Sequence, residues 1–252
     1  MLKQKHRTEK KKAQQVTALM KGNPNGQCDD FRMLLSKNRY FAVPFILIVT
    51  FLLILLGIYG NDRMFLFVNN SHCRSADILF LILTNLGDGA VAVVLMVVLL
   101  WVSYRDALTF MVITILLTII VTFLKKIIFP EFDRPVTYFG SSELLRLVSG
   151  YDPPKLHSFP SGHAATAFSV YLYLAFLSKR NIVKLTLFII AFFVALSRVY
   201  LSAHFPRDVV AGALIAVVMT FICYYWSRKI KVSGIDKKLV FGTKVFTKQK
   251  AV

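Results

Sequence analysis

Histidine and aspartate residues in the C-terminal half stand at spacings that suit proton transfer and nucleophilic attack. His204 lies four residues before Asp208, across a turn containing Pro206, so the carboxylate can accept a ring N–H and fix the tautomer of His204. A second histidine, His163, follows Pro160-Ser161-Gly162. Two histidines can supply a nucleophile and an acid, so the set predicts a reaction that uses both.

The same region carries groups that bind phosphate oxygens. Ser161 and Gly162 fall at a predicted helix N-terminus, where free backbone amides and the helix dipole attract anions. Arg134 and Arg198 add planar guanidinium groups, whose donor forks match phosphate oxygens. Together with the histidines, these residues predict a phosphoryl-transfer site.

Each of these residues also has a structural interpretation. Ser161 suits a helix N-cap, Asp208 suits the first turn of a helix, and Arg198 suits neutralisation of a buried acid. His157, six residues before His163, has no evident step in the chemistry. We expect His157 to shape the site.

The spacing of these residues resembles that of the type 2 phosphatidic acid phosphatase (PAP2) superfamily over about residues 60–227. Two motifs carry the resemblance: Pro-Ser-Gly-His at 160–163, and Ser197-Arg198 followed by five residues, His204, three residues and Asp208. The first family motif, a lysine followed after six residues by Arg-Pro, is present only approximately.

Arg134-Pro135 fits this first motif, but Ile127 occupies the lysine position. Lys126 lies one residue earlier and Lys125 two, so we predict that Lys126 binds phosphate. In the alternative interpretation both lysines only anchor a helix end at the membrane interface.

The resemblance implies six transmembrane helices around a metal-independent active site at the outer membrane face. It implies that His204 attacks phosphorus to give a phosphohistidine, that Asp208 orients His204, and that His163 protonates the leaving oxygen and then activates water. The implied phosphate-binding residues are Lys126, Arg134, Ser161, Gly162 and Arg198.

The composition agrees with an all-α, polytopic membrane protein. Of the 252 residues, 56% are hydrophobic and 17% are charged, against about 25% charged in a soluble domain. A bilayer core needs about 20 apolar residues per helix. Six stretches come near that length: Phe41 to Tyr59, about Ala76 to Ser103 with an interruption at Asn85 to Gly89, Ala107 to Phe129, Ser161 to Ser178, Ile182 to Ala203, and Asp208 to Trp226.

The net charge of +18 is concentrated in the two ends of the chain, so nucleic acid is not an expected partner. Residues 1–39 hold ten Lys/Arg and three acidic residues, and residues 228–252 hold eight and one. We predict that both segments are basic cytoplasmic tails, the first largely disordered, around a membrane domain at 40–227. The tails either bind anionic lipids or only determine topology. The long segment 130–160 is then predicted outside.

No cofactor or metal is predicted, because the sequence shows no carboxylate cluster for Mg²⁺ and the three cysteines fit no zinc pattern. The expected protein is a bacterial inner-membrane phosphatase with its site facing the periplasm. Candidate substrates are undecaprenyl diphosphate, phosphatidylglycerol phosphate, phosphatidate and lipid A phosphates. The alternatives are a lipid phosphotransferase of the same fold and a non-catalytic transporter or lipid-binding protein.

Overall fold

The computed structural model of the chain describes residues 24–140 and 144–230. It forms two compact units, the first ending at Arg39 and the second beginning at Tyr40. Residues 1–23 and 231–252, which contain most of the predicted basic tails, lie outside the described residues.

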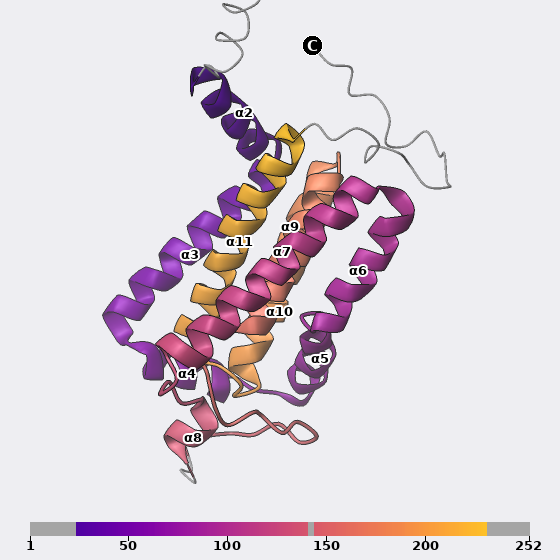
Figure 1. The fold of residues 1–252 in the computed structure, drawn as a ribbon. Helices are drawn as coiled ribbons and strands as arrows, with labels where there is room; N and C mark the ends of the chain where they lie inside the picture. Colours follow the sequence, from indigo (N-terminus) through magenta and orange to yellow (C-terminus); the bar gives the residue numbers. More distant parts are fainter. Residues whose placement is uncertain (1–23, 141–143, 231–252) are drawn as a thin grey trace, which may run out of the picture. The chain divides into compact units, whose positions relative to one another are not determined.

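The described residues form helices and no β-strand, which confirms the all-α prediction for them (Figure 1). The helices are α2 (Pro24–Lys37), α3 (Arg39–Tyr59), α4 (Asn61–Asn70), α5 (Arg74–Asn85), α6 (Gly89–Val102), α7 (Tyr104–Phe123), the π-helix η1 (Leu124–Ile128), α8 (Pro135–Phe139), α9 (Gly162–Leu177), α10 (Asn181–Tyr200) and α11 (Pro206–Lys229).

Four helical segments are long and apolar enough to cross a bilayer: α3, α7 with η1, α10 and α11. α5 and α6 meet the same criteria as a pair bent by 48°, which gives a fifth span if the pair counts as one. α9 has 16 residues and is about 24 Å long, against a bilayer core of about 30 Å. The described residues therefore support four to five spans, and the predicted sixth would have to be α9.

α9 is packed among the other helices of the second unit. It packs against α10 and α11 and also contacts α6 and α7. Ten of its residues are buried, and small residues such as Ala164 and Ala167 let the neighbouring backbones approach. Its N-terminus is recessed, because Ser161 packs against Gly212, nearly two turns into α11. His163, in the first turn of α9, therefore lies close to the helices that α9 contacts.

Three short helices occupy segments that the sequence analysis assigned to a tail or to loops. α2 occupies Pro24–Lys37, within the predicted tail at 1–39. α8 lies in the segment 130–160 that is predicted outside, and α4 lies between the first two predicted apolar stretches (Figure 1). Phe65 of α4 stacks on Phe139 of α8, with ring centroids 5.5 Å apart, and also contacts Phe205 at 5.3 Å. Such short helices form through tertiary packing, which sequence periodicity does not reveal.

Polar contacts close the other end of the second unit, where α7 begins and α11 ends. Arg105 Nη1 donates to the carbonyls of Ser227 at 2.6 Å and Ile230 at 2.8 Å. Arg228 forms an ion pair with Asp106, at the start of α7. These contacts satisfy the last carbonyls of α11 and fix α7 against it.

Candidate active site

His204 stands in the turn between α10 and α11. The carbonyl of Arg198 accepts hydrogen bonds from the backbone N–H of Ala203 at 2.9 Å and of His204 at 3.0 Å, which makes the turn tight. Pro206 then begins α11, where its fixed backbone angle favours a helix start. The turn leaves His204 only 2% exposed.

Arg134 is held by backbone carbonyls against His204. Its Nε donates to Leu156 O at 2.7 Å and its Nη1 to Ala203 O at 2.9 Å. Nη1 also lies 3.3 Å from Nε2 of His204. Because a guanidinium group has no acceptor, the ring nitrogen facing it must carry the lone pair. This contact favours the tautomer of His204 that is protonated on Nδ1 and carries its lone pair on Nε2.

The electrostatics of the pair favour a neutral imidazole beside a cation. Burial lowers the pKa of His204 to about 3, the nearby carboxylate of Asp208 opposes this change, and the charges of Arg134 and Lys125 add to it. Burial, followed by the nearby charge of Arg198, lowers the pKa of Arg134 to about 10, so Arg134 stays charged at pH 7. Cations that repel one another in a buried site favour a bound anion.

Asp208 lies near His204 but does not bond directly to its ring. Its Oδ2 accepts from the Ser158 hydroxyl at 2.5 Å and from the Phe205 amide at 3.0 Å, and its Oδ1 is 3.4 Å from Arg207 Nε. Nδ1 of His204 is 3.7 Å from Oδ2, too long for a hydrogen bond. The structure thus brings Asp208 to His204 without the direct bond that the sequence predicted. Asp208 also caps α11 through the Phe205 amide.

His163, in the first turn of α9, has a partner that the sequence analysis missed. Its Nε2 is 3.8 Å from Oδ2 of Asp88, the N-cap of α6. Gly87 permits this approach, because a Cβ there would come within 2.6 Å of Val194 Cγ1 and 3.2 Å of the His163 carbonyl oxygen. The sequence signal nearest to this contact is the interruption of the second apolar stretch at Asn85 to Gly89.

Ser161 is placed differently from the prediction. Its amide donates to the Asp208 carbonyl at 2.9 Å, and its Oγ accepts from the Ala164 amide at 3.4 Å. The Ser161 amide is therefore not a free anion donor, and Ser161 caps α9 instead. The Gly162 amide, at the first position of α9, belongs to the N–H groups that a helix leaves without an internal partner. Gly212 makes this arrangement possible, since a Cβ there would lie 2.3 Å from the Ser161 carbonyl oxygen.

Lys125, rather than the predicted Lys126, is the lysine coupled to the site. Lys125 is half-buried and interacts electrostatically with Arg134, Asp208 and Arg198, whereas the Lys126 side chain is exposed. The cause is η1, because a π-helix has more residues per turn than an α-helix and rotates the side chains that follow. The geometry therefore favours Lys125 over Lys126, the lysine that sequence distance favours.

Arg198 lies on α10, and its guanidinium interacts electrostatically with Lys125 and Arg134. Its Nη1 donates to the Thr84 hydroxyl, and its guanidinium carbon lies 5.7 Å from the centre of the Tyr151 ring. The side chain is buried, and among the described residues its Nε has no hydrogen-bond partner. A buried N–H without a partner is a donor that an anion can satisfy.

A polar network fixes the turn that carries His204. Ser202 adopts a left-handed backbone with φ of 58°. Asn69 of α4 donates to the Ser202 hydroxyl and to the Arg146 carbonyl, each at 3.0 Å, and Arg146 pairs with Asp77 at 2.8 Å. These residues come from three distant segments, so their contact is not evident from the sequence.

His157 contributes through its backbone. It has a left-handed φ of 55°, and its carbonyl lies 3.4 Å from Nη2 of Arg134 as a hydrogen-bond acceptor. Its ring Nδ1 is buried and has no hydrogen-bond partner among the described residues. The His157 carbonyl thus helps to hold Arg134 in place.

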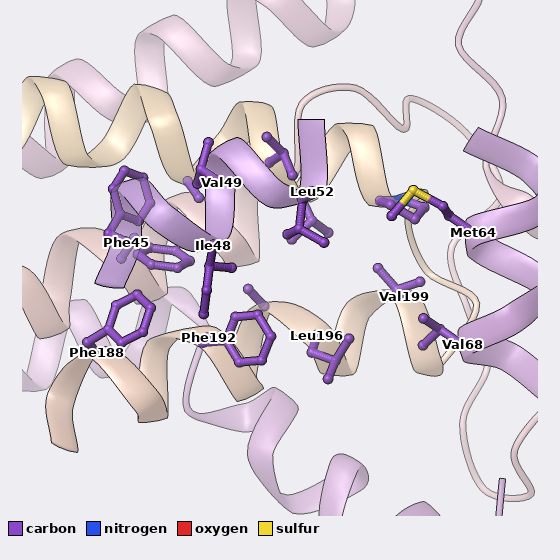
Figure 2. A pocket seen from close by; sticks show the side chains of 16 residues that line it. Phe45, Ile48, Val49, Leu52, Met64, Val68, Phe188, Phe192, Leu196 and Val199 are labelled. Carbon is purple, nitrogen blue, oxygen red and sulfur yellow. The ribbon is translucent and has the colours of Figure 1, made fainter. Parts of the chain in front are cut away.

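An apolar pocket lies beside this polar site, between α3, α10 and α11 (Figure 2). Phe45 and Leu52 line it on α3, and Phe188 lines it on α10. It extends to Val199 and Pro206, which flank the turn of His204. All of its lining side chains are apolar, so it offers a hydrocarbon-like environment near the turn of His204.

Comparison with known proteins identifies the family. The profile of the PAP2 superfamily matches residues 106–231, half of the chain, and this range contains all three motif regions. The chain belongs to the PAP2 superfamily.

Individual PAP2 relatives match a shorter segment. The chain is 39% identical over 83 residues to phosphatidylglycerophosphatase B of Bacillus subtilis and 33% identical over 72 residues to lipid A 4'-phosphatase of Bacteroides thetaiotaomicron. Each match covers 29% of this chain, and 41% and 32% of the respective relatives. The chain thus matches less than half the length of these curated relatives.

Two solved structures share the fold over more of the chain. LpxE of Aquifex aeolicus superposes with a TM-score of 0.58 and 29% identity, covering 65% of this chain and 94% of LpxE. A transmembrane PAP2-type phosphatidylglycerolphosphate phosphatase from Bacillus subtilis gives 0.53 and 23%, covering 76% and 98%. With its apolar helices, the chain is therefore an integral membrane protein.

The two adjacent lysines provide a matched pair for testing the phosphate site. We expect Lys125→Ala to lower turnover by about tenfold to a hundredfold, as for loss of a charged hydrogen bond to the transferred group. Lys126→Ala should leave turnover near that of the wild type, because its side chain is exposed. Steady-state phosphate release by both purified variants measures this difference. A larger loss in Lys126→Ala would contradict the register set by η1.

Proposed function

We propose that this protein is a lipid phosphate phosphatase that works through a phosphohistidine on His204. The observation that carries the proposal is the contact between Arg134 and Nε2 of His204, at 3.3 Å. It directs the lone pair of a neutral imidazole toward a positively charged cluster. Membership of the PAP2 superfamily and the relatives named as phosphatases support the same function.

In the proposed first step, a phosphate oxygen replaces Nε2 of His204 as the acceptor for Arg134, Nε2 attacks phosphorus, and the bond to the lipid oxygen breaks. His163, whose Nε2 lies 3.8 Å from Oδ2 of Asp88, donates a proton to the leaving oxygen. Arg134, Arg198 and Lys125 neutralise the charge on the equatorial oxygens, with the Gly162 amide as a further donor. In the second step, His163 takes a proton from water, which attacks phosphorus, and His204 leaves.

The proposed reaction needs no metal ion. Within the described ranges, no group of three or more His, Cys, Asp or Glu side chains is arranged to hold one. The charge of the phosphate would instead be balanced by the guanidinium groups of Arg134 and Arg198 and by the ammonium group of Lys125.

We also propose that the substrate is a membrane lipid presented from the outer leaflet of a bacterial inner membrane. The phosphate groups of undecaprenyl diphosphate, phosphatidylglycerol phosphate, phosphatidate and lipid A would all suit the cationic cluster, while their chains stay in the bilayer. The orientation is the one expected from the Lys/Arg distribution.

In a variant with Cys28→Ser and Cys223→Ser, exposed Cys73 should react with an impermeant maleimide in intact cells. Protection of Cys73 until the cells are lysed would contradict this orientation.

The two histidines should separate by role. His204→Ala should abolish turnover and the phosphoenzyme. His163→Ala should still react with an aryl phosphate, whose leaving group needs little protonation, and then stall for want of a base. Rapid quench of His163→Ala should therefore trap acid-labile, base-stable phosphate, absent from the double variant with His204→Ala.

Two controls complete this experiment. Phosphate release by the wild type from a panel of lipid phosphates should persist in excess EDTA. Activity that is abolished by chelator and restored by one divalent ion would reject the metal-free mechanism. A label that survives in His204→Ala and disappears in His163→Ala would reverse the proposed roles.

A further inference from the structure

Ser158 stands between Asp208 and His204 in a fully buried position. Its side chain is 0% exposed, and its amide donates to the Phe132 carbonyl at 2.9 Å, which fixes its backbone. Its Oγ is 2.5 Å from Oδ2 of Asp208 and 3.5 Å from Nδ1 of His204. Ser158 thus contacts both members of a pair whose own separation, 3.7 Å, is too long for a hydrogen bond.

The donors and acceptors of Asp208, Ser158 and His204 allow only one arrangement of the protons between them. An ionised Asp208 can only accept, so the Ser158 hydroxyl donates to it. The lone pairs of Oγ then face Nδ1 of His204, which must be the donor. Arg134 independently requires a proton on Nδ1, because it occupies Nε2 from the other side of the ring. Both constraints agree on the tautomer.

We infer that Ser158 is a positioning residue, which connects Asp208 to His204 through its hydroxyl and holds the ring for attack by Nε2. This inference rests on the proposed phosphatase function. When Nε2 bonds to phosphorus, the ring gains positive charge, and its Nδ1–H polarises toward Oγ and through it toward Asp208. The carboxylate, committed to the Phe205 amide and near Arg207, then acts on the ring through Ser158.

A purely structural Ser158 predicts a different result. In that case its hydroxyl only anchors the loop to Asp208, and its loss would lower the stability of the protein without a specific effect on the chemical step. The kinetic constants of folded variants therefore distinguish the two roles, as does coupling between Ser158 and Asp208.

The test uses the full-length protein and the lipid phosphate that the wild type hydrolyses fastest. We expect Ser158→Ala to lower kcat about tenfold to a hundredfold, as for loss of a hydrogen bond to a charged group, with KM little changed. Ser158→Thr, which keeps the hydroxyl, should recover part of the lost rate. Ser169→Ala, which removes a buried hydroxyl from the middle of α9, should match the wild type.

A double variant tests the connection itself. Because Ser158 and Asp208 act on the ring in series, Ser158→Ala combined with Asp208→Asn should be no slower than the slower single variant. Losses that multiply, or a folded Ser158→Ala with wild-type kcat, would overturn the inference. If Ser158→Ala does not fold, Ser158→Cys, of similar volume but with a weaker donor, should show the reduced kcat, and wild-type kcat there would overturn it equally. A wild type that releases no phosphate would instead reject the proposed function.

Discussion

A guanidinium group donates hydrogen bonds and accepts none, and this constraint governs the arrangement around His204. Arg134 lies against one ring nitrogen, so the ring proton must be on the other side, where Ser158 and Asp208 lie. The same contact directs the lone pair toward positive charge, where a phosphate oxygen is favoured. Tautomer and charge are thus set by a single buried contact.

The rest of the second unit holds this contact in place. Backbone carbonyls of Leu156 and Ala203 fix the guanidinium. Asn69 of α4 holds the turn that carries His204, because its side-chain amide donates a hydrogen bond to the Ser202 hydroxyl. Gly212 allows Ser161 to approach α11 so closely that α9 begins beside Asp208. Each support joins segments distant in sequence, so the site depends on the packed helices.

The sequence was sufficient for features that depend on local spacing. Apolar stretches predicted the long helices, and the four-residue spacing predicted that Asp208 lies near His204, where its Oδ2 is 3.7 Å from Nδ1. Sequence distance favours Lys126, whereas the geometry favours Lys125, because η1 rotates the end of α7 and nothing in the apolar pattern signals a π-helix. Asp88 and Ser158 were missed because their proximity to the histidines depends on the break between α5 and α6 and on the path of the 130–160 segment. Such contacts exist only after tertiary packing.

The central claim is that attack occurs through Nε2 of His204, and the position of the phosphoryl group on the trapped enzyme tests it most directly. Phosphopeptides from the quenched protein can be assigned by NMR, because the two phosphohistidine isomers carry phosphorus on different ring nitrogens. The structure predicts phosphorus on Nε2 of His204, since Nδ1 is protonated and faces Ser158. Phosphorus on Nδ1 of His204, or on His163, would contradict it.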